Sequence, residues 1–554
     1  MNGLMMDVPL CTSALVRRAR ALHPGKPIVT RRPDRSLHRS TYLECIRRAG
    51  RLASGLRRLG VRPGDRVGTL AWNHWRHLEA YLAIPSSGAV LHTLNLRLHP
   101  DDISFICSHA EDRVVLVDKV LWPLWEKVAP HVRVEHVIVM SDDGSVPDGT
   151  IDYEDLIEAA SDDFEFEDVD EQRAAAMCYT SGTTGRPKGV VYSHRSLTLH
   201  AMGLALNDCF RIGERDVVLP VVPMFHVNCW GLPYLCTMAG CAQVHPGPHL
   251  DPANLLDLLA TERVTLTAGV PTIWLGILQK LDAEPGRHDL SNLHTMVVGG
   301  SAAPEAMMRG FKERHGLTIV HAWGMTETSP LGTVSRLTTQ LELQDEATQW
   351  AYRAKQGRPV PFVEVRARTE SGLAPWDGTT MGELEVRGPW VAASYYNTEE
   401  GAQAFTADGW FRTGDIVTID THGYVTIQDR AKDLVKSGGE WISSVALESA
   451  LMGHPAVAEA AVIAVPHAKW DERPLAVVVL KQGQAATPHD LRMFLADRFA
   501  KWWVPDDVAL VESIPKTSAG KFLKSALREQ HKDHYGVHDP SARGTSHPPV
   551  APTH

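Results

Sequence analysis

Helix and strand signals alternate along the first 300 residues, and this alternation restricts the fold more than any other feature of the chain. The first long helix signal begins at a capping-box pattern, Thr41-x-x-Glu44, and ends at Gly60. A second helix signal spans 75–84, and the strand signals lie at 66–72, 114–117, 216–220, 266–268 and 295–298. Parallel strands joined by crossover helices produce this order. We therefore predict an α/β fold with two mainly parallel α/β subdomains.

The pattern changes after about residue 355. Short strand signals at 363–367, 382–386 and 424–427 are separated by turns rich in Gly and Pro, which predicts a small β-barrel-like subdomain. We place a boundary near Asp429-Arg430, so that a large N-terminal domain (1–429) precedes a smaller α+β domain (430–530). Residues 531–554 hold five histidines and four prolines, and we interpret them as a disordered tail rather than a metal-binding one.

Composition excludes several classes of protein. The chain has 554 residues, 44% of them hydrophobic, which argues against wholesale disorder. Its net charge of −10 argues against a general nucleic-acid binder. Eight cysteines form no C-x-x-C pair, and Asp7 stands where a signal peptide needs an apolar core. We therefore expect reduced thiols in a cytoplasmic protein.

The charge is unevenly distributed along the chain. Residues 1–66 carry fifteen basic and four acidic side chains, a net of +11, which leaves −21 for the rest. Much of the excess lies on the first long helix signal, at Arg47, Arg48, Arg51, Arg57 and Arg58. We interpret these arginines as a solvated face or a subunit contact, and transient binding to a membrane surface with anionic lipid is the second interpretation.

The sharpest local motif is the string at 179–189, Tyr-Thr-Ser-Gly-Thr-Thr-Gly-Arg-Pro-Lys-Gly. Its glycines let backbone N–H groups approach an anion, its hydroxyl groups add donors, and Lys188 adds a positive charge. It is not a Walker A motif, because Pro187 stands where that motif has its second glycine and Gly189 follows the lysine. The string therefore predicts a phosphate-binding loop of a different kind.

This string resembles the signature of the adenylate-forming superfamily, which includes acyl- and aryl-CoA synthetases, luciferases and peptide-synthetase adenylation domains. Further motifs follow in the order that the superfamily has. They are Trp323-Gly-Met-Thr-Glu327, Gly409-Trp-Phe-Arg-Thr-Gly-Asp415, Asp429-Arg-Ala-Lys-Asp433 with Lys436-Ser-Gly-Gly-Glu440, and Pro515-Lys-Thr-Ser-Ala-Gly-Lys521. The resemblance extends from about residue 10 to 530 and is strongest to bacterial medium- and long-chain fatty acyl-CoA synthetases.

The resemblance implies an ATP-dependent, AMP-forming acid–thiol ligase. In such enzymes a carboxylate attacks the α-phosphate of ATP to give acyl-AMP and pyrophosphate, and the thiol of coenzyme A then displaces AMP. Glu327 is implied as a Mg²⁺ ligand, with a hydroxyl from Thr180, since magnesium favours one carboxylate plus phosphate oxygens and water. Lys521 is implied as the catalytic lysine of adenylation. Lys432 is implied as the hinge of a mobile C-terminal domain.

The same resemblance implies the contacts to nucleotide and coenzyme A. Asp415 and Arg430 would bind the ribose, and Trp323 would stack on adenine where the family more often has tyrosine. The implied contacts in the phosphate loop are Thr180, Ser181, Gly182, Thr183, Thr184, Gly185 and Lys188. Those elsewhere are Gly300, Ser301, Ala302, Gly324, Met325, Thr326, and, near coenzyme A or the nucleotide, Lys436 and Trp441.

The string at 223–231, Pro-Met-Phe-His-Val-Asn-Cys-Trp-Gly, resembles the acyl-pocket motif of fatty acyl-CoA synthetases. The resemblance makes Trp230 the gate of the acyl tunnel and places His226 near the carboxylate, with Val227 and Gly299 as further acid contacts; ordinary core packing is the alternative. We predict a fatty acid as substrate. A short thioether acid such as 3-methylmercaptopropionate, or a carrier protein in place of coenzyme A, are the alternatives.

The predicted partners are a small carboxylic acid, ATP with Mg²⁺, and coenzyme A. A homodimer is implied by the resemblance alone, and no nucleic acid is expected. A sensor that binds nucleotide without turnover is the non-enzymatic reading. It is disfavoured because Lys521, Glu327 and Asp415 are all present.

Overall fold

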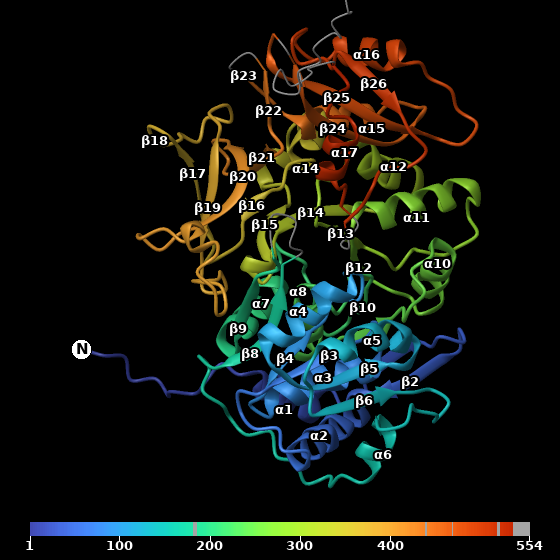
Figure 1. Cartoon of the computed structure of the whole chain (residues 1–554), viewed down its shortest axis with the longest axis vertical. Coiled ribbons are helices and arrows are strands. Elements are labelled where there is room, and N and C mark those ends of the chain that lie inside the picture. Colours follow the sequence, from blue (N-terminus) through green and yellow to red (C-terminus); the bar gives the residue numbers. More distant parts are fainter. Residues whose placement is uncertain (181–185, 438–439, 468, 518–520, 536–554) are drawn as a thin grey trace, which may run out of the picture. The chain divides into compact units, whose positions relative to one another are not determined.

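The computed structural model describes residues 1–180, 186–437, 440–467, 469–517 and 521–535 (Figure 1). The chain divides into two compact units: the first comprises residues 1–427 with 517–521, and the second comprises 428–516 with 522–554. The functional roles expected of the two parts of the chain stay predictions.

Two large sheets form the first unit, and most of their neighbouring strands are parallel. One sheet has the order β16 (Arg358–Pro359), β15 (Leu331–Ser335), β14 (Ile319–Gly324), β13 (Thr295–Val298), β12 (Leu266–Gly269), β10 (Val217–Pro220), β11 (Ala242–His245), β1 (Pro27–Arg31) and β2 (Leu37–Thr41). The other has the order β7 (Ile151–Asp152), β6 (His136–Met140), β5 (Asp112–Asp118), β3 (Arg66–Leu70), β4 (Val90–Thr93), β8 (Ala174–Tyr179) and β9 (Gly189–Ser193). The prediction of two mainly parallel subdomains is confirmed.

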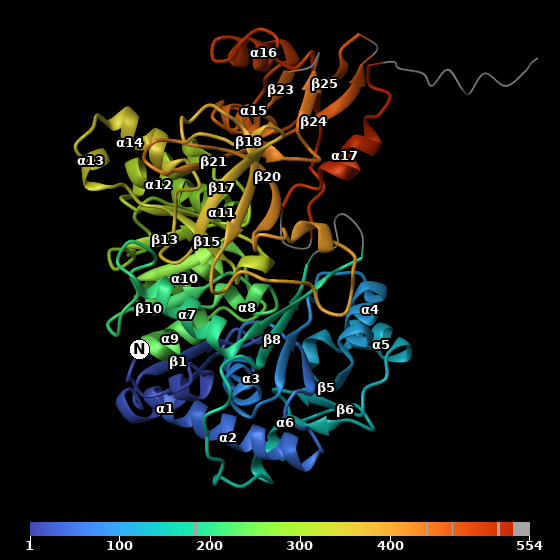
Figure 2. The same ribbon diagram turned by 90° about the vertical axis from the view of Figure 1, so that its left-hand side faces the viewer.

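Helices cover both sheets in layers (Figures 1 and 2). The core that the two sheets share is filled by α1 (Thr12–Leu22), α2 (Tyr42–Arg58), α3 (Trp75–Ser86), α7 (His194–Ala205) and α9 (Leu232–Ala239). A second core joins the nine-stranded sheet to α10 (Pro252–Thr261), α11 (Pro271–Ala283), α12 (Glu305–His315) and α14 (Glu346–Arg353). A third joins the seven-stranded sheet to α4 (Pro100–Ala110) and α5 (Trp122–Val128). Short α6 (Tyr153–Glu158) and α13 (Thr339–Glu342) complete the long connections.

The predicted barrel-like subdomain is an open sheet. Its order is β18 (Gly372–Leu373), β17 (Glu364–Thr369), β19 (Gly382–Arg387), β20 (Phe411–Ile419) and β21 (Val425–Arg430), all antiparallel where their pairing is described. The prediction of a barrel was wrong on closure, because β18 and β21 stay at opposite edges of the described sheet. Two-residue β18 offers little edge to pair with.

The second unit is built on a mainly antiparallel sheet. Its path is β23 (Glu440–Ile442), β22 (Val435–Ser437), β25 (Asp471–Leu480) and β24 (Val457–His467), and β26 (Asp507–Leu510) pairs with β25 in parallel. Its helices are α15 (Ser444–Met452), α16 (Pro488–Ala496) and α17 (Lys524–Gln530). Apolar residues of α15 and α16 pack on one face of this sheet, and Leu527 of α17 packs on the other. The expected α+β character is present in this unit.

The start of the predicted disordered tail is ordered. The hydroxyl of Tyr535 donates to the carbonyl of Pro474 at 2.9 Å, and Nε2 of His534 lies 2.9 Å from Oδ2 of Asp507. The expectation of disorder from residue 531 was therefore wrong for 531–535, because an aromatic side chain and an ion pair hold this segment to the second unit. The rest of the predicted tail lies outside the described residues.

All eight cysteines are free thiols in this structure, and all are buried. In the described part of the chain, no helix is long and apolar enough to cross a bilayer. No group of three or more His, Cys, Asp or Glu side chains in that part could hold a metal ion.

The arginines of α2 are mostly paired within the chain. Arg48 donates from Nε to Glu79 at 2.6 Å and from Nη1 to Glu154 at 2.8 Å, and Tyr153 donates to the other oxygen of Glu79 at 2.6 Å. Arg51 binds Asp162. The interpretation of these arginines as a solvated face was wrong for Arg48, whose partner Glu79 is buried, whereas Arg51 and Asp162 pair at the surface. The later, acidic part of the chain supplies their counter-charges, which no local pattern reveals.

We expect Arg48→Met to destabilise the protein strongly. The carboxyl group of Glu79 is fully buried, which raises its pKa although Arg48 opposes the shift, so loss of the guanidinium leaves a buried charge without its cation. The free energy of unfolding in urea should fall by about 3–5 kcal/mol. Exposed Arg47, one position earlier on α2, provides the control, and Arg47→Met should change it by less than about 0.5 kcal/mol. The ion pair is not structural if both variants unfold at the wild-type midpoint.

Candidate active site

The phosphate loop joins two antiparallel strands of the seven-stranded sheet, β8 and β9. Thr180 and Lys188 close its base through two hydrogen bonds: Thr180 N donates to the carbonyl of Lys188 at 2.9 Å, and Lys188 N donates to Oγ1 of Thr180 at 3.0 Å. The loop therefore starts at the carboxyl end of a strand, where open α/β sheets bind ligands. The predicted contacts Ser181, Gly182, Thr183, Thr184 and Gly185 lie outside the described residues.

Lys188 and Glu327 both contact one tyrosine. The hydroxyl of Tyr395 donates to Oε1 of Glu327 at 2.7 Å, and Nζ of Lys188 lies 5.4 Å from the centroid of the Tyr395 ring. Glu327 belongs to the short 3₁₀ turn Thr326–Thr328 after β14 and is 5% exposed. Burial, first of all, and the charge of Glu327 raise the pKa of Tyr395, which keeps its hydroxyl protonated as a donor. This arrangement brings a carboxylate near the cation of the phosphate loop.

Sequence reasoning missed the segment that carries Tyr395. Tyr396 N donates to the carbonyl of Gly189 at 2.9 Å, so this segment also fastens the far end of the phosphate loop. Ala392 N donates to the carbonyl of Glu327 at 2.8 Å. The two tyrosines lie in an irregular stretch between β19 and β20 with no helix or strand period, and no motif in the sequence marked them.

Trp323 and Asp415 are in direct contact. The indole Nε1–H of Trp323, near the end of β14, donates to Oδ2 of Asp415 in β20 at 2.9 Å, and both side chains are more than 90% buried. The backbone of Gly332 lies against the Trp323 ring, since a Cβ at that glycine would come within 2.4 Å of it. The indole thus gives a donor to the buried carboxylate, which the phenol ring of tyrosine cannot do from the same edge.

The remaining predicted contacts on β14 form a tight turn. Gly324 approaches the carbonyl of Pro330 so closely that a Cβ would lie 1.8 Å from its oxygen, and β14 has a register shift at this point. Met325 N donates to the same carbonyl at 3.1 Å. The hydroxyl of Tyr192 donates to the carbonyl of Thr326 at 2.8 Å. This turn fixes the direction in which Glu327 leaves the strand.

The turn after β13 lies beside the acyl-pocket motif. A Cβ on Gly299 would lie 3.1 Å from the ring of Trp230, so a larger residue here would have to displace the indole by a few tenths of an ångström. Gly300 has a φ of 86°, a left-handed conformation that favours glycine. Ser301 is exposed and Ala302 is partly buried. The structure therefore brings two of the predicted acid contacts, Gly299 and Trp230, into direct proximity.

The acyl-pocket motif contains a strained left-handed turn. Val227, Asn228, Cys229 and Trp230 all have φ between 46° and 54°, and Gly231 follows at 75°. Residues 227–230 form α8 (Val227–Trp230), and none of the four has the negative φ of a right-handed helix. A run of non-glycine residues in this region costs free energy, and such strain is concentrated at ligand-binding sites.

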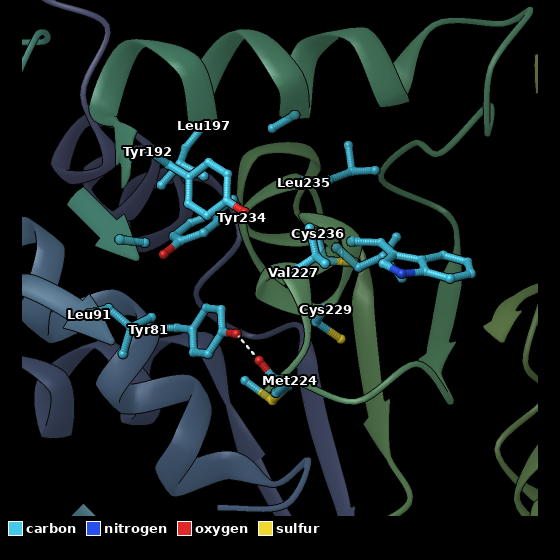
Figure 3. Packing of buried hydrophobic residues seen from close by; sticks show 14 of the residues in the cluster. Tyr81, Leu91, Tyr192, Leu197, Met224, Val227, Cys229, Tyr234, Leu235 and Cys236 are labelled. Carbon is cyan, nitrogen blue, oxygen red and sulfur yellow. Dashed lines mark hydrogen bonds between the residues drawn. The ribbon is translucent and has the colours of Figure 1, made fainter. Parts of the chain in front are cut away.

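Three tyrosines pack behind this turn (Figure 3). The hydroxyl of Tyr81 donates to the carbonyl of Met224, and the rings of Tyr81 and Tyr234 lie 5.6 Å apart. Tyr192 packs in the same core cluster. The hydroxyl of Tyr234 is buried without a hydrogen-bond partner among the described residues. The three tyrosines and Trp230 belong to the same buried core.

His226 is held neutral. Burial, with a smaller effect of the positive charge on Lys521 and Arg97, lowers the pKa of His226 to about 4. The imidazole therefore presents one donor and one acceptor nitrogen at neutral pH. A neutral ring beside the acyl motif can hydrogen-bond a carboxylic acid without competing for its charge.

The remaining predicted residues lie on β22 and β23, in the hinge motif and at Lys521, which belongs to the first unit. Lys436 and Trp441 face each other across β22 and β23, with Nζ 5.0 Å from the indole centroid. Arg430 is partly exposed and ends β21. Burial lowers the pKa of Lys432. Close to Lys521, Thr517 N donates to its carbonyl at 2.7 Å, which closes a turn.

Two acids of the hinge motif are anchored to α17, which sequence reasoning missed. Lys524 binds Glu448 at 2.7 Å and lies 4.0 Å from Asp429, and Arg528 binds Asp433. Asp429 also accepts from the backbone N of Ser444 at 3.1 Å. The two basic residues of α17 are about a hundred residues away in sequence from the acids that they meet. The folded unit therefore shows, as the sequence does not, that α17 holds both Asp429 and Asp433 of the hinge motif.

A model of the AMP-binding enzyme family matches residues 16–396, and a model of the AMP-binding enzyme C-terminal domain matches 446–521. The chain belongs to the AMP-binding enzyme family. The phosphate loop, the Trp323–Asp415 contact and the buried Glu327 all fall in or beside the first of these matches.

Relatives agree over nearly the whole length of this AMP-binding enzyme. A long-chain-fatty-acid–CoA ligase of Thermus thermophilus is 51% identical over 536 residues, with 96% of this chain and 97% of that protein covered. A 3-methylmercaptopropionyl-CoA ligase of Ruegeria pomeroyi is 44% identical, with 96% and 99% covered. The crystal structure of the anthranilate CoA ligase AuaEII in complex with anthranoyl-AMP matches with a TM-score of 0.85 at 25% identity, covering 96% and 99%. The predicted superfamily and its nearness to bacterial fatty acyl-CoA synthetases are confirmed.

We expect Trp323→Phe to weaken AMP binding. The change keeps an aromatic ring but removes the indole N–H, so the buried carboxylate of Asp415 loses a donor. The dissociation constant for AMP, measured by calorimetry, should rise about three- to tenfold, since a hydrogen bond to a charged group contributes about 1.5–3 kcal/mol and water can replace part of it. Trp376→Phe, at an exposed tryptophan of the same unit, should leave it unchanged. Equal affinity for AMP in the wild type, Trp323→Phe and Trp376→Phe would show that the Trp323–Asp415 hydrogen bond does not contribute to nucleotide binding.

Proposed function

We propose that this AMP-binding enzyme is an ATP-dependent acyl-CoA ligase that acts on a fatty acid. The observation that carries the proposal is the placement of Glu327, a buried carboxylate held by Tyr395 beside the lysine of the phosphate loop. A catalyst that brings an anionic acid to a polyphosphate needs fixed groups that neutralise and orient charge. The relatives named above, which are ligases of coenzyme A, support the same reaction.

The proposed reaction has two balanced steps. A carboxylate oxygen forms a bond to the α-phosphorus of ATP, and the bond from that phosphorus to the β-phosphate bridging oxygen breaks, so that pyrophosphate leaves with its electron pair. The thiolate of coenzyme A then bonds to the carbonyl carbon of the acyl-AMP. The bond between this carbon and the phosphate oxygen breaks, and AMP leaves.

Mg²⁺ fits the donor set that the chain offers. Glu327 presents one carboxylate whose Oε1 is already oriented by Tyr395, and the phosphate loop begins with the hydroxyl of Thr180. One carboxylate with a hydroxyl is too few for a cage made of protein alone, which agrees with magnesium's preference for phosphate oxygens and water. We propose that Glu327 and Thr180 hold the ion, which when bound neutralises charge on the phosphates.

The other roles in the proposal follow the motifs. Asp415 binds the ribose and Trp323 orients it while stacking on adenine, with Arg430 as a second ribose contact. Lys521 stabilises the charge that develops at the α-phosphate during adenylation. Lys432 is the hinge between the two half-reactions, and Lys436 with Trp441 contacts nucleotide or coenzyme A. In this proposal the first unit binds ATP and acid, and the second moves between the half-reactions.

A short thioether acid is the second candidate substrate. Tyr81, Tyr192 and Tyr234 are buried in the same core as Trp230, and a short acid needs less space in such a core than a long acyl chain does. The Ruegeria pomeroyi relative, a 3-methylmercaptopropionyl-CoA ligase, supports this candidate, and the Thermus thermophilus relative supports a long chain.

The proposal is tested by AMP release. Purified protein is mixed with ATP, Mg²⁺, coenzyme A and one acid of a series that runs from propionate to stearate and includes 3-methylmercaptopropionate. We expect AMP and acyl-CoA in equal amounts with at least one of these acids. The chain length that gives the highest kcat/KM identifies the substrate class.

Lys521→Ala serves as the matched control for contaminating ligases, and we expect no AMP from it with any acid. AMP formation that requires a carrier protein in place of free coenzyme A would redirect the proposal to carrier loading. The absence of AMP with every acid would refute it.

A further inference from the structure

A second ligand-sized cavity lies in the first unit, apart from every residue assigned above to nucleotide, acid or coenzyme A. Its volume is about 370 Å³, which falls in the range of small-molecule sites. The residues that line it follow the carboxyl ends of β1, β3, β5, β6 and β11. Both large sheets therefore contribute to it.

The cavity lies at the topological switch point of the seven-stranded sheet. β3 and β5 are neighbours there, but β3 leads through α3 to β4 on one side, whereas β5 leads through α5 to β6 on the other. α3 packs in the core between the sheets, and α5 packs on the outer face. The connections that follow β3 and β5 therefore run to opposite faces of the sheet. A crevice forms between them at the carboxyl ends of these strands, which is where open α/β sheets bind ligands.

The walls of the cavity are fixed by hydrogen bonds. Asp118, at the end of β5, accepts from the backbone N of Trp72 at 2.8 Å and from Nε2 of His74 at 2.6 Å. Trp75 N donates to Oγ1 of Thr30 in β1 at 3.1 Å. The segment after β3 is therefore held to β5 and to β1 at once. A site that is formed before its ligand arrives loses less entropy on binding.

One cation of the cavity has no acidic partner. The other three cations of the lining are paired with carboxylates, as Arg31 with Asp257, Arg76 with Asp142, and Lys119 with Asp143. Arg32 has no carboxylate within 4.0 Å among the described residues, and its guanidinium lies 3.2 Å from Nδ1 of His38. Its Nε is buried and makes no hydrogen bond in the described part of the chain.

The histidine beside Arg32 cannot compensate its charge. Burial first, and then the positive charges of Arg32 and Arg76, lower the pKa of His38 to about 4, so the ring is neutral. Asp34 is exposed, and its Oδ1 accepts from the backbone N and the hydroxyl of Ser36. A positive charge therefore remains at the cavity, with a buried N–H that lacks an acceptor.

The rest of the lining is part charged and part apolar. The carboxylates of Asp118, Asp142 and Asp143 also line the cavity, and each is hydrogen-bonded to a neighbouring side chain, namely His74, Arg76 and Lys119. The guanidinium of Arg32 lies 5.5 Å from the centroid of the Trp75 ring, and Trp72, Val120 and Pro248 line the cavity with it. Flat rings and prolines accommodate an aromatic or branched body, while Arg32 provides for one negative charge.

We propose that this cavity binds a small amphipathic monoanion, with its anionic head on Arg32 and its apolar body against Trp72, Val120 and Pro248. The site is separate from the proposed ligase site. It takes the class of ligand that carries one carboxylate, sulfate or phosphate monoanion on a flat or branched hydrocarbon body.

The probe for the test is 2-naphthoate, whose binding is measured by ligand-detected NMR and calorimetry on the full chain. We expect Arg32→Gln to weaken binding by about tenfold or more, because the charge-assisted hydrogen bonds are lost. Arg35→Gln is the matched control: it is an exposed arginine of the same turn outside the lining, and it should bind as the wild type does. 2-Naphthamide, the neutral analogue, should bind weakly and equally to all three proteins.

Val120→Trp provides an independent variant that keeps Arg32. Val120 is exposed at the rim of the cavity, so a larger side chain can fill it without disturbing the core, and 2-naphthoate binding should be lost. Thermal melting checks that each variant is folded. Wild-type affinity in both Arg32→Gln and Val120→Trp, or no binding to the wild type at millimolar probe, would overturn the proposal. Because binding is measured directly, the outcome does not depend on the ligase reaction.

Discussion

Parallel pairing of strands is the constraint on which both sites of this protein depend. Parallel strands need crossover helices, so their carboxyl ends gather at one edge of each sheet and leave backbone groups and loop side chains there. The phosphate loop follows β8, the Gly299 turn follows β13, and the turn that bears Glu327 follows β14. The cavity around Arg32 uses the ends of β1, β3 and β5 in the same way. The fold thus supplies positions, and the residues at those positions decide the chemistry.

Charge pairing within the first unit explains why the uneven charge of the sequence misleads. Arg48 and Arg76 share Glu154, and Glu79 is buried between Arg48 and Tyr153. The basic beginning of the chain is therefore neutralised by acids that come later, so the +11 of residues 1–66 is not a free surface charge. The guanidinium of Arg32 is not paired in this way, because the side chain it meets among the described residues is His38, whose low pKa keeps the ring neutral.

The sequence predicted what is encoded locally. The capping box at Thr41 and Glu44 is present, and the predicted strand 295–298 has the bounds of β13. The motifs identified the superfamily and brought attention to Glu327, Trp323 and Asp415. Contacts between distant segments were not predictable: Tyr395 meets Glu327 across 68 residues, and no period or motif marks it. The open edges of the sheet formed by β17–β21 were missed for the same reason. The sequence pattern predicts where strands lie, but it does not predict which strands pair.

The central claim is that the acid is activated as a mixed anhydride with AMP, and oxygen-18 tests this most directly. The preferred acid, labelled in both carboxylate oxygens, is converted with unlabelled ATP, Mg²⁺ and coenzyme A, and the products are analysed by mass spectrometry. Attack of a carboxylate oxygen on the α-phosphorus predicts one labelled oxygen in AMP, one in the thioester carbonyl and none in pyrophosphate. Label in inorganic phosphate with ADP as the nucleotide product, or unlabelled AMP, would contradict the account.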